Sequence, residues 1–105
     1  YVIRNRGWDT VFQVPVSIDG REPVVTIPQS MFRARLTPGP HQLRLVFDGA
    51  QVDQDISMDR GGIRYVEIKE AGRFSGAQFE WSELNASAAI TRAKSSKLIA
   101  DLDLR

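Results

Sequence analysis

The single histidine of this 105-residue chain, His41, is the first side chain that could act as an acid or base at neutral pH. A general base needs a partner group and a pocket that holds the substrate within reach. His41 follows Thr37-Pro38-Gly39-Pro40, a run of turn-forming residues. The alternation after this turn predicts that His41 faces the core at the end of a strand, opposite Leu36. We therefore interpret His41 as a structural histidine.

Four aspartates, Asp48, Asp53, Asp55 and Asp59, are the next candidates, because carboxylates bind calcium. Their spacing does not match the EF-hand loop, so we interpret them as residues of solvated strand faces and a turn. With one histidine and no cysteine, the chain has too few ligands for a zinc site. The sequence therefore predicts no metal and no cofactor.

Catalytic motifs are missing from the sequence. It has no nucleophile elbow, phosphate-binding loop or dinucleotide fingerprint. Only a carboxylate pair remains for a hydrolase, so we predict a non-enzymatic protein without catalytic residues. The net charge is +1 and acidic residues balance the basic ones, which predicts no nucleic-acid partner. No apolar run is long enough to span a membrane.

The elements that would position these residues are mostly strands. Apolar and polar residues alternate with a period of two, between turns such as Asp19-Gly20 and Asp48-Gly49. The pattern predicts strands near 1–6, 14–18, 24–27, 32–36, 42–47, 52–58, 63–69 and 77–84. Seven or eight short strands at this spacing are typical of an antiparallel β-sandwich or barrel. We expect one domain over residues 1–105.

A helix is predicted near the C-terminus, over residues 86–95. Ala86, Ala89, Ile90 and Ala93 recur at helical spacing, and Asn85 occupies the N-cap position. Alternation returns after the helix, over residues 98–104.

The turn at 37–40 also predicts a register for the strands on either side of it. A four-residue loop would pair Leu36 with His41, Ala34 with Leu43 and Phe32 with Leu45. The same register sets Arg33 across from Arg44, and these like charges would repel each other. If residues 48–51 form the next loop, Asp55 lies beside Arg44, with Asp53 and Arg35 near by. We therefore expect a ladder of arginines and aspartates on a solvated sheet face.

Two groups of residues are candidate partner contacts. Trp8 and Phe74 lie in predicted loops, where aromatic side chains are available for binding. The tail carries Leu98, Leu102 and Leu104 on one face of its alternation. The tail either completes the domain's own sheet, which we favour, or adds its edge to the sheet of another chain.

Arginine outnumbers lysine by 11 to 3. This excess suits bidentate binding of carboxylate or phosphate, although a compositional bias of the source genome explains it as well.

Several of these turn motifs resemble a family of small bacterial envelope lipoproteins of unknown function. The resemblance is carried by Tyr1-Val2-Ile3-Arg4, Ser17-Ile18-Asp19-Gly20, the run from Leu36 to Leu43, and Gly62-Ile63-Arg64-Tyr65-Val66. The turn before His41 is also similar to PEGA-type surface-layer modules. Two features depart from the pattern: Pro40 replaces a basic residue, and the connection over 21–31 is longer.

The resemblance implies a prealbumin-like (transthyretin-like) or immunoglobulin-like sandwich with one short C-terminal helix. It also implies a place in the bacterial envelope, on the periplasmic side, with a membrane tether only through a lipidated cysteine upstream of Tyr1. We therefore expect a non-enzymatic domain that binds another envelope protein or a cell-wall polymer. The alternative is a module that binds a small molecule or a glycan.

Overall fold

The computed structural model describes residues 1–4, 13–71 and 78–105. Within them, short segments of alternating polarity form nine strands, and one segment with helical spacing forms a helix. The elements are β1 (Val2–Arg4), β2 (Val14–Ile18), β3 (Val24–Thr26), β4 (Ser30–Arg35), β5 (Gly39–Phe47), β6 (Ala50–Met58), β7 (Tyr65–Ala71), β8 (Gln78–Leu84), α1 (Ala86–Ala93) and β9 (Lys97–Asp103).

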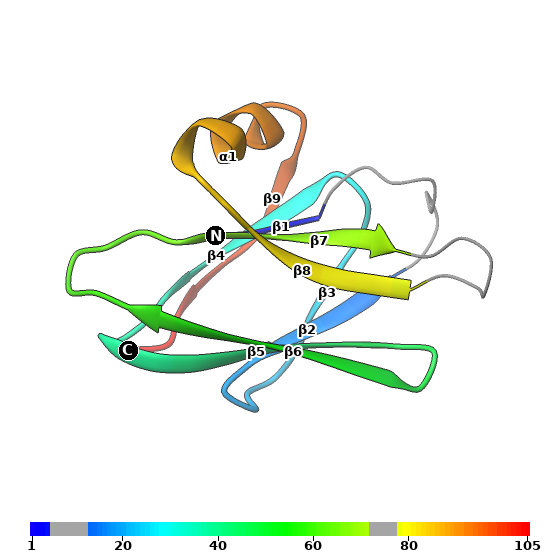
Figure 1. The fold of residues 1–105 in the computed structure, drawn as a ribbon, viewed down its shortest axis with the longest axis horizontal. Helices are drawn as coiled ribbons and strands as arrows, with labels where there is room; N and C mark the ends of the chain where they lie inside the picture. Colours follow the sequence, from blue (N-terminus) through cyan, green and yellow to red (C-terminus); the bar gives the residue numbers. More distant parts are fainter. Residues whose placement is uncertain (5–12, 72–77) are drawn as a thin grey trace.

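The strands form two sheets that pack face to face, with α1 on the outer face of one of them (Figure 1). We call the five-stranded sheet, with order β8-β7-β1-β4-β9, sheet A, and the four-stranded sheet, with order β3-β2-β5-β6, sheet B. The prediction of an all-β chain with one short helix near its C-terminus is confirmed. The predicted strand number was too low, because the described residues contain nine strands.

The prediction of purely antiparallel pairing is wrong. In sheet A, β1 pairs with β7 in parallel and β4 pairs with β9 in parallel. Parallel neighbours need long crossover connections, and the alternation within a strand does not reveal which distant strand it will join. Sheet B is antiparallel throughout.

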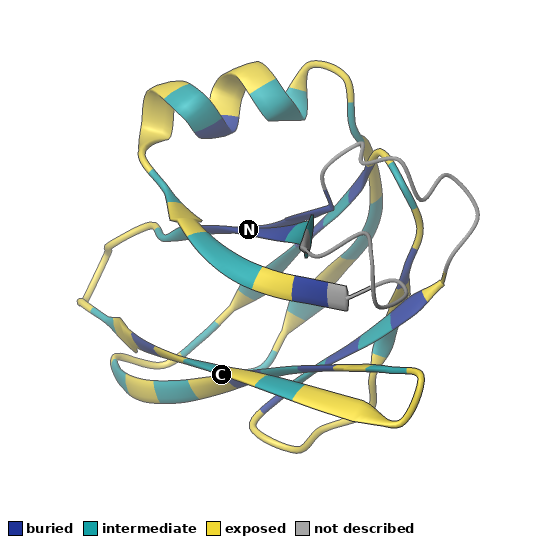
Figure 2. Cartoon of the chain, turned by 45° about the vertical axis from the view of Figure 1, so that its right-hand side comes forward, coloured by how far each residue is buried: buried dark blue, intermediate teal, exposed yellow. Residues whose placement is uncertain are grey.

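The core lies between the sheets, where the inward residues of every second position meet (Figure 2). Val14, Val16 and Phe32 are at most 1% exposed. Across the interface, Trp81 of β8 donates from its indole nitrogen to the main-chain oxygen of Val52 in β6, at 3.0 Å. Strands β6 and β8 are edge strands of different sheets, so this bond ties the two sheets together along one side.

The hairpin predicted around residues 37–40 does not form. Strand β4 belongs to sheet A and β5 to sheet B, so the segment between them crosses from one sheet to the other. Phe32 pairs with Val2 and Ala100 instead of Leu45, and His41 pairs with Ile56 instead of facing Leu36. The physical reason is the repulsion that a hairpin would create between Arg33 and Arg44. When the two strands lie in separate sheets, each arginine has an aspartate opposite it.

Those aspartates are Asp101 for Arg33 and Asp53 for Arg44. The turn after β5 contains two residues, Asp48 and Gly49, both with positive φ angles (50° and 76°). This tight turn sets Arg44 opposite Asp53 and not Asp55, as a 48–51 loop would have done. A ladder of arginines and aspartates therefore exists, but it is divided between the outer faces of the two sheets.

Helix α1 begins as predicted and is held by a buried carboxylate. The Asn85 side-chain oxygen accepts from the Ala88 main-chain nitrogen at 2.8 Å, which caps the first turn. Ala89 packs against the outer face of sheet A and is 1% exposed. Beside it, Glu67 of β7, also 1% exposed, accepts from Arg92 at 2.6 Å. This ion pair ties the helix to the sheet.

An arginine is buried inside the sandwich as well. Arg4 is 1% exposed and donates to the main-chain oxygen of Thr26 at 3.1 Å, linking sheet A to sheet B. Its guanidinium lies 4.8 Å from the centre of the Phe79 ring, a cation–π geometry.

Candidate functional site

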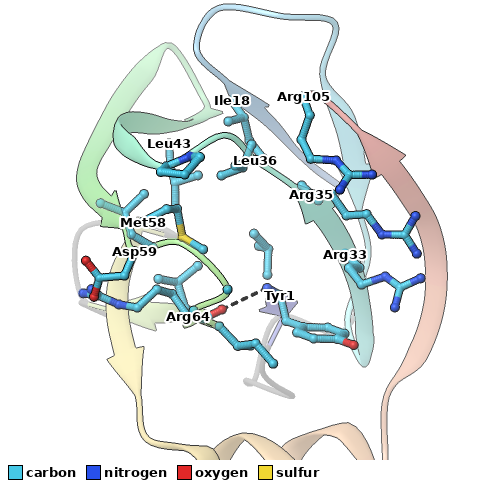
Figure 3. Close-up of a pocket in the computed structure, with 18 of the residues that line it drawn as sticks. Tyr1, Ile18, Arg33, Arg35, Leu36, Leu43, Met58, Asp59, Arg64 and Arg105 are labelled. Atoms are coloured by element: carbon cyan, nitrogen blue, oxygen red, sulfur yellow. Dashed lines mark hydrogen bonds between the residues drawn. The ribbon is translucent and has the colours of Figure 1, made fainter.

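A pocket of about 490 Å³ opens between the sheets at one end of the sandwich (Figure 3). It lies where the chain passes twice between the sheets, once after β4 and once over residues 59–64 after β6. The first residues of the chain, Tyr1 and Val2, line it together with Arg105. We call this space the crossover pocket.

The floor of the crossover pocket is apolar. Ile18, Leu43 and Ile56 come from sheet B, and Val2 and Val66 come from sheet A. All five are buried core residues. Leu36 and Met58 are half-buried and form the walls nearer the mouth. The pocket is therefore an opening into the hydrophobic core, suited to an apolar group.

The mouth of the crossover pocket is charged and mostly positive. Within the described part of the chain, the charged residues that line the pocket are five arginines and one aspartate: Arg33, Arg35, Arg60, Arg64, Arg105 and Asp59. None of the three lysines of the chain takes part. Arginine differs from lysine in that its planar guanidinium can bind a carboxylate or a phosphate with two parallel hydrogen bonds.

Three of these arginines, Arg33, Arg35 and Arg105, lie side by side at one wall and turn their guanidinium groups toward β9 (Figure 3). Arg33 donates from Nε to Asp101 at 3.0 Å, and Arg105 donates to Asp103 at 2.9 Å. Arg35 forms no ion pair with the described residues, although it stands opposite Asp103. This arginine cluster thus has three guanidinium groups for two carboxylates.

The arginines of this wall lower the pKa values of the two aspartates that they contact. The hydrogen bond from Arg33 and the charges of Arg33 and Arg35 lower the pKa of Asp101. Hydrogen bonds from Arg105, together with the charge of Arg35, hold the pKa of Asp103 well below its usual range. Both carboxylates therefore stay ionised at neutral pH, and Arg35 is shared rather than neutralised by a carboxylate of its own.

The other wall of the mouth is held by Arg64. It donates to the main-chain oxygen of Ser57 at 3.1 Å and forms an ion pair with Glu83. Its own main-chain oxygen accepts from the Tyr1 main-chain nitrogen at 3.0 Å. On the same segment Arg60 is exposed and forms no ion pair with the described residues, and Ile63 is 62% exposed. On this segment, Arg64 is held by its partners, whereas the neighbouring Arg60 and Ile63 are exposed.

His41 lies outside this pocket. Its Nδ1 is 2.6 Å from an Asp19 carboxylate oxygen, and its Nε2 is 2.6 Å from the Thr37 main-chain oxygen. Both neighbours are hydrogen-bond acceptors, so this geometry favours the doubly protonated imidazolium. The Asp19 and Thr37 hydrogen bonds raise the pKa of His41, against the effects of burial and of Arg21.

The carboxylate of Asp19, which contacts His41, is also held by hydrogen bonds. Burial alone would raise the pKa of Asp19, but its bonds to His41 and to the Gln42 main-chain nitrogen lower it. Asp19 has a positive φ of 52° and belongs to the turn after β2. His41 thus joins this turn to the crossover segment, as a structural histidine does, although its predicted place opposite Leu36 was wrong.

The aspartates considered for calcium do not converge. Asp53 is bound by Arg44 at 2.9 Å on the outer face of sheet B, while Asp59 lines the crossover pocket. Among residues 1–4, 13–71 and 78–105, no three His, Asp or Glu side chains are close enough to hold a metal ion.

The predicted contact residues separate into three groups. Trp8 and Phe74 lie outside the described residues. Leu102 and Leu104 are half-buried and pack against the core, whereas Leu98 is 48% exposed. The register of β9 against β4 shifts between Met31 and Phe32, which inserts an extra residue, Ile99, into β9. This bulge removes Leu98 from the face that Leu102 and Leu104 share.

The residues of the crossover pocket were not predicted as a site. The excess of arginine over lysine was the signal in the sequence that pointed toward it. The pairing of β4 with β9, which gathers Arg33, Arg35 and Arg105, could not be derived from the alternation.

The sequence matches no family model, no curated protein and no solved structure at a significant level. The resemblance to envelope lipoproteins therefore depends on the turn motifs alone. No helix in the described part of the chain is long and apolar enough to cross a membrane.

Proposed function

We propose that this domain is a non-catalytic binding module that takes a small molecule into the crossover pocket. The observation that supports this proposal is the pocket itself. Its floor is apolar and continuous with the core, and arginines line its mouth. Its volume of about 490 Å³ lies within the range of roughly 300–1,000 Å³ that is usual for small-molecule sites.

Two observations support a role without catalysis. Both ring nitrogens of His41, the only histidine, are held by acceptors, so neither is available as a base. Asp101 and Asp103, the carboxylates nearest the arginine cluster, are ionised and bound by arginines. A general acid would need a raised pKa instead.

The shape of the pocket favours an apolar ligand over a glycan. Sugars are usually held on exposed aromatic faces together with hydrogen-bonding groups, but among the described residues that line the pocket only Tyr1 is aromatic. Tyr1 stacks on Tyr65 at 5.6 Å between ring centres, so one of its faces is already occupied.

The test uses N-phenyl-1-naphthylamine, an uncharged probe that fluoresces in apolar surroundings. We expect its fluorescence to rise with added protein and its nuclear magnetic resonance shifts to map to Ile18, Leu43 and Met58. Ala34→Phe places a ring in the pocket and should abolish the signal, while Ala86→Phe, on the exposed start of α1, should not. Shifts that map elsewhere, or equal binding by both variants, would contradict the proposal.

A protein partner is our second proposal, and one observation favours it. Strand β3 is an edge of sheet B and carries Val25, which is 47% exposed, followed by Ile27, which is 44% exposed. Such an edge can receive an extended segment of another chain. Val25→Lys should then abolish crosslinking to that partner in cells and leave probe binding in the crossover pocket unchanged.

The envelope location and the prealbumin-like assignment also remain proposals, supported by the turn motifs and by the two-layer arrangement of sheets. The parallel pairs in sheet A depart from an all-antiparallel sandwich. Fractionation of cells that express the full-length protein tests the location: recovery in the detergent-soluble envelope fraction supports it, and recovery in the cytosol refutes it.

A further inference from the structure

We infer that the ligand of the crossover pocket is an anionic amphiphile with a single hydrocarbon chain and a carboxylate or phosphate head group. This inference rests on the proposed binding function and adds the chemical class of the ligand. The chain would lie between the sheets, and the head group would remain at the mouth.

The apolar half of the inference follows from the floor of the pocket. Ile18, Leu43 and Val66 are at most 4% exposed, and the side chains that these residues present to the pocket are hydrocarbon. A polar group placed there would lose its hydrogen bonds to water without replacement, which is costly. A hydrocarbon chain would gain free energy for each methylene group that leaves water.

The charged half follows from the side chains at the mouth. Arg33, Arg64 and Arg105 are fixed by carboxylates of β8 and β9. Arg35 and Arg60 form no ion pair with the described residues. Arg35 comes from the end of β4, and Arg60 follows Asp59, which lies at the opposite wall (Figure 3). Arg35 therefore lines one wall, with its guanidinium turned toward β9 (Figure 3), and Arg60 belongs to the segment that forms the other wall. Both are near the place where a head group would emerge.

The sign of the charge at the mouth of the pocket determines which head groups are favoured. Among the described lining residues Asp59 is the one carboxylate, and it stands against Arg35 and Arg60, the two arginines without an ion pair to a described residue. A cationic head group would be repelled by Arg35 and Arg60, and only Asp59, of the lining residues that the structure describes, could attract it. An anionic head group could accept bidentate hydrogen bonds from either arginine, and these are stronger than bonds between neutral groups.

The experiment compares four ligands that share a ten-carbon chain: decanoate, decyl phosphate, decanol and decylammonium. Each displaces N-phenyl-1-naphthylamine from the protein, below the concentration at which it forms micelles. We expect both anions to bind about tenfold more tightly than decanol, and decylammonium to bind most weakly. The preference for anions should shrink at high salt, because exposed charges are screened.

The double variant Arg35→Gln, Arg60→Gln should bring the anions to within about twofold of decanol. The control Arg44→Gln removes an arginine from the outer face of sheet B and should keep the preference. Thermal unfolding checks that the variants fold; with the described residues, Arg35 and Arg60 hold no ion pair that the substitutions would break.

The outcomes are distinguishable. Equal binding of all four ligands in the pocket would refute the anionic class and leave the binding function standing. Tighter binding of decylammonium would also refute it, because Asp59 would then dominate the mouth. Failure of all four ligands and of the probe would refute the proposed function itself. A preference for only one of the two anions would support the inference and identify the head group.

Discussion

At the scale of single residues, several charged side chains of this domain stabilise the fold through hydrogen bonds and ion pairs with specific partners. His41 lies between two oxygen acceptors, and Arg4 bridges the two sheets through Thr26. A buried polar group is tolerated only when such partners replace water. Arg35 and Arg60 are exposed, so water solvates them, and neither forms an ion pair with the described residues.

His41 should make the stability of the domain depend on pH. A raised pKa means that the imidazolium stabilises the folded state fully below the ordinary value of 6.5. This contribution is lost as the pH rises through the folded-state pKa. The lowered pKa of Asp19 adds no change in this window, because its contribution is lost only in acid. We expect the melting temperature to fall as the pH rises from about 6 to 9.

The variant His41→Gln should remove this dependence and lower stability by about 1–3 kcal/mol at low pH, through the loss of charge-assisted hydrogen bonds. Urea unfolding of both proteins across the pH range provides the measurement. Parallel pH profiles for wild type and variant would show that His41 is not the titrating group.

At the scale of elements, helix α1 depends on a carboxylate in the sheet beneath it. Glu67 is buried and accepts from Arg92, while Ala89 is the one buried residue of the helix. With so little apolar surface covered, the ion pair contributes much of the attachment.

Glu67→Gln should therefore loosen the helix without unfolding the sandwich. We expect a loss of about 1–3 kcal/mol, since the Arg92 guanidinium loses its charged partner. Hydrogen exchange should accelerate in α1 more than in β5 or β7. Glu80→Gln, at an exposed position of β8, is the matched control. Equal acceleration in both variants would mean that the helix is held by its other contacts.

The bulge in β9 makes a second prediction at this scale. Leu102 packs against the core, whereas Leu98 is half-exposed. Leu102→Ala should cost about 1–2 kcal/mol, because part of a buried side chain is lost. Leu98→Ala should cost less than about 0.5 kcal/mol. Chemical denaturation distinguishes them, and similar losses would show that the two leucines share one face after all.

The sequence predicted local features better than distant ones. The strand positions, the Asn85 cap and the turn at Asp19 depend on neighbouring residues and were predictable. The pairing of β4 was not, since an alternating strand fits equally well in an antiparallel hairpin or a parallel pair. The like charges of Arg33 and Arg44 were the one local sign that the hairpin reading was wrong.

At the scale of the whole molecule, the crossover pocket is a product of the topology. It opens where the chain crosses between the sheets, and its arginines come from segments far apart in the sequence. This explains why the candidate site was missed: a motif search reads neighbouring residues, whereas these side chains meet only after β4 and β9 have paired.

The parallel pairs of sheet A also determine the order in which the domain can assemble. Strand β1 pairs with β7 and β4 pairs with β9, which both come much later in the sequence. Strands β1 and β4 therefore lack these neighbours until the later segments have folded onto them. The hairpins β2–β3 and β5–β6 need only nearby residues. Closing long loops is slow, so pulse-labelling during refolding should protect the amides of Leu43 and Leu45 before those of Ile3 and Phe32. Simultaneous protection would instead indicate one concerted step, whereas a lag would leave the sheet edges of β1 and β4 open to other chains during synthesis.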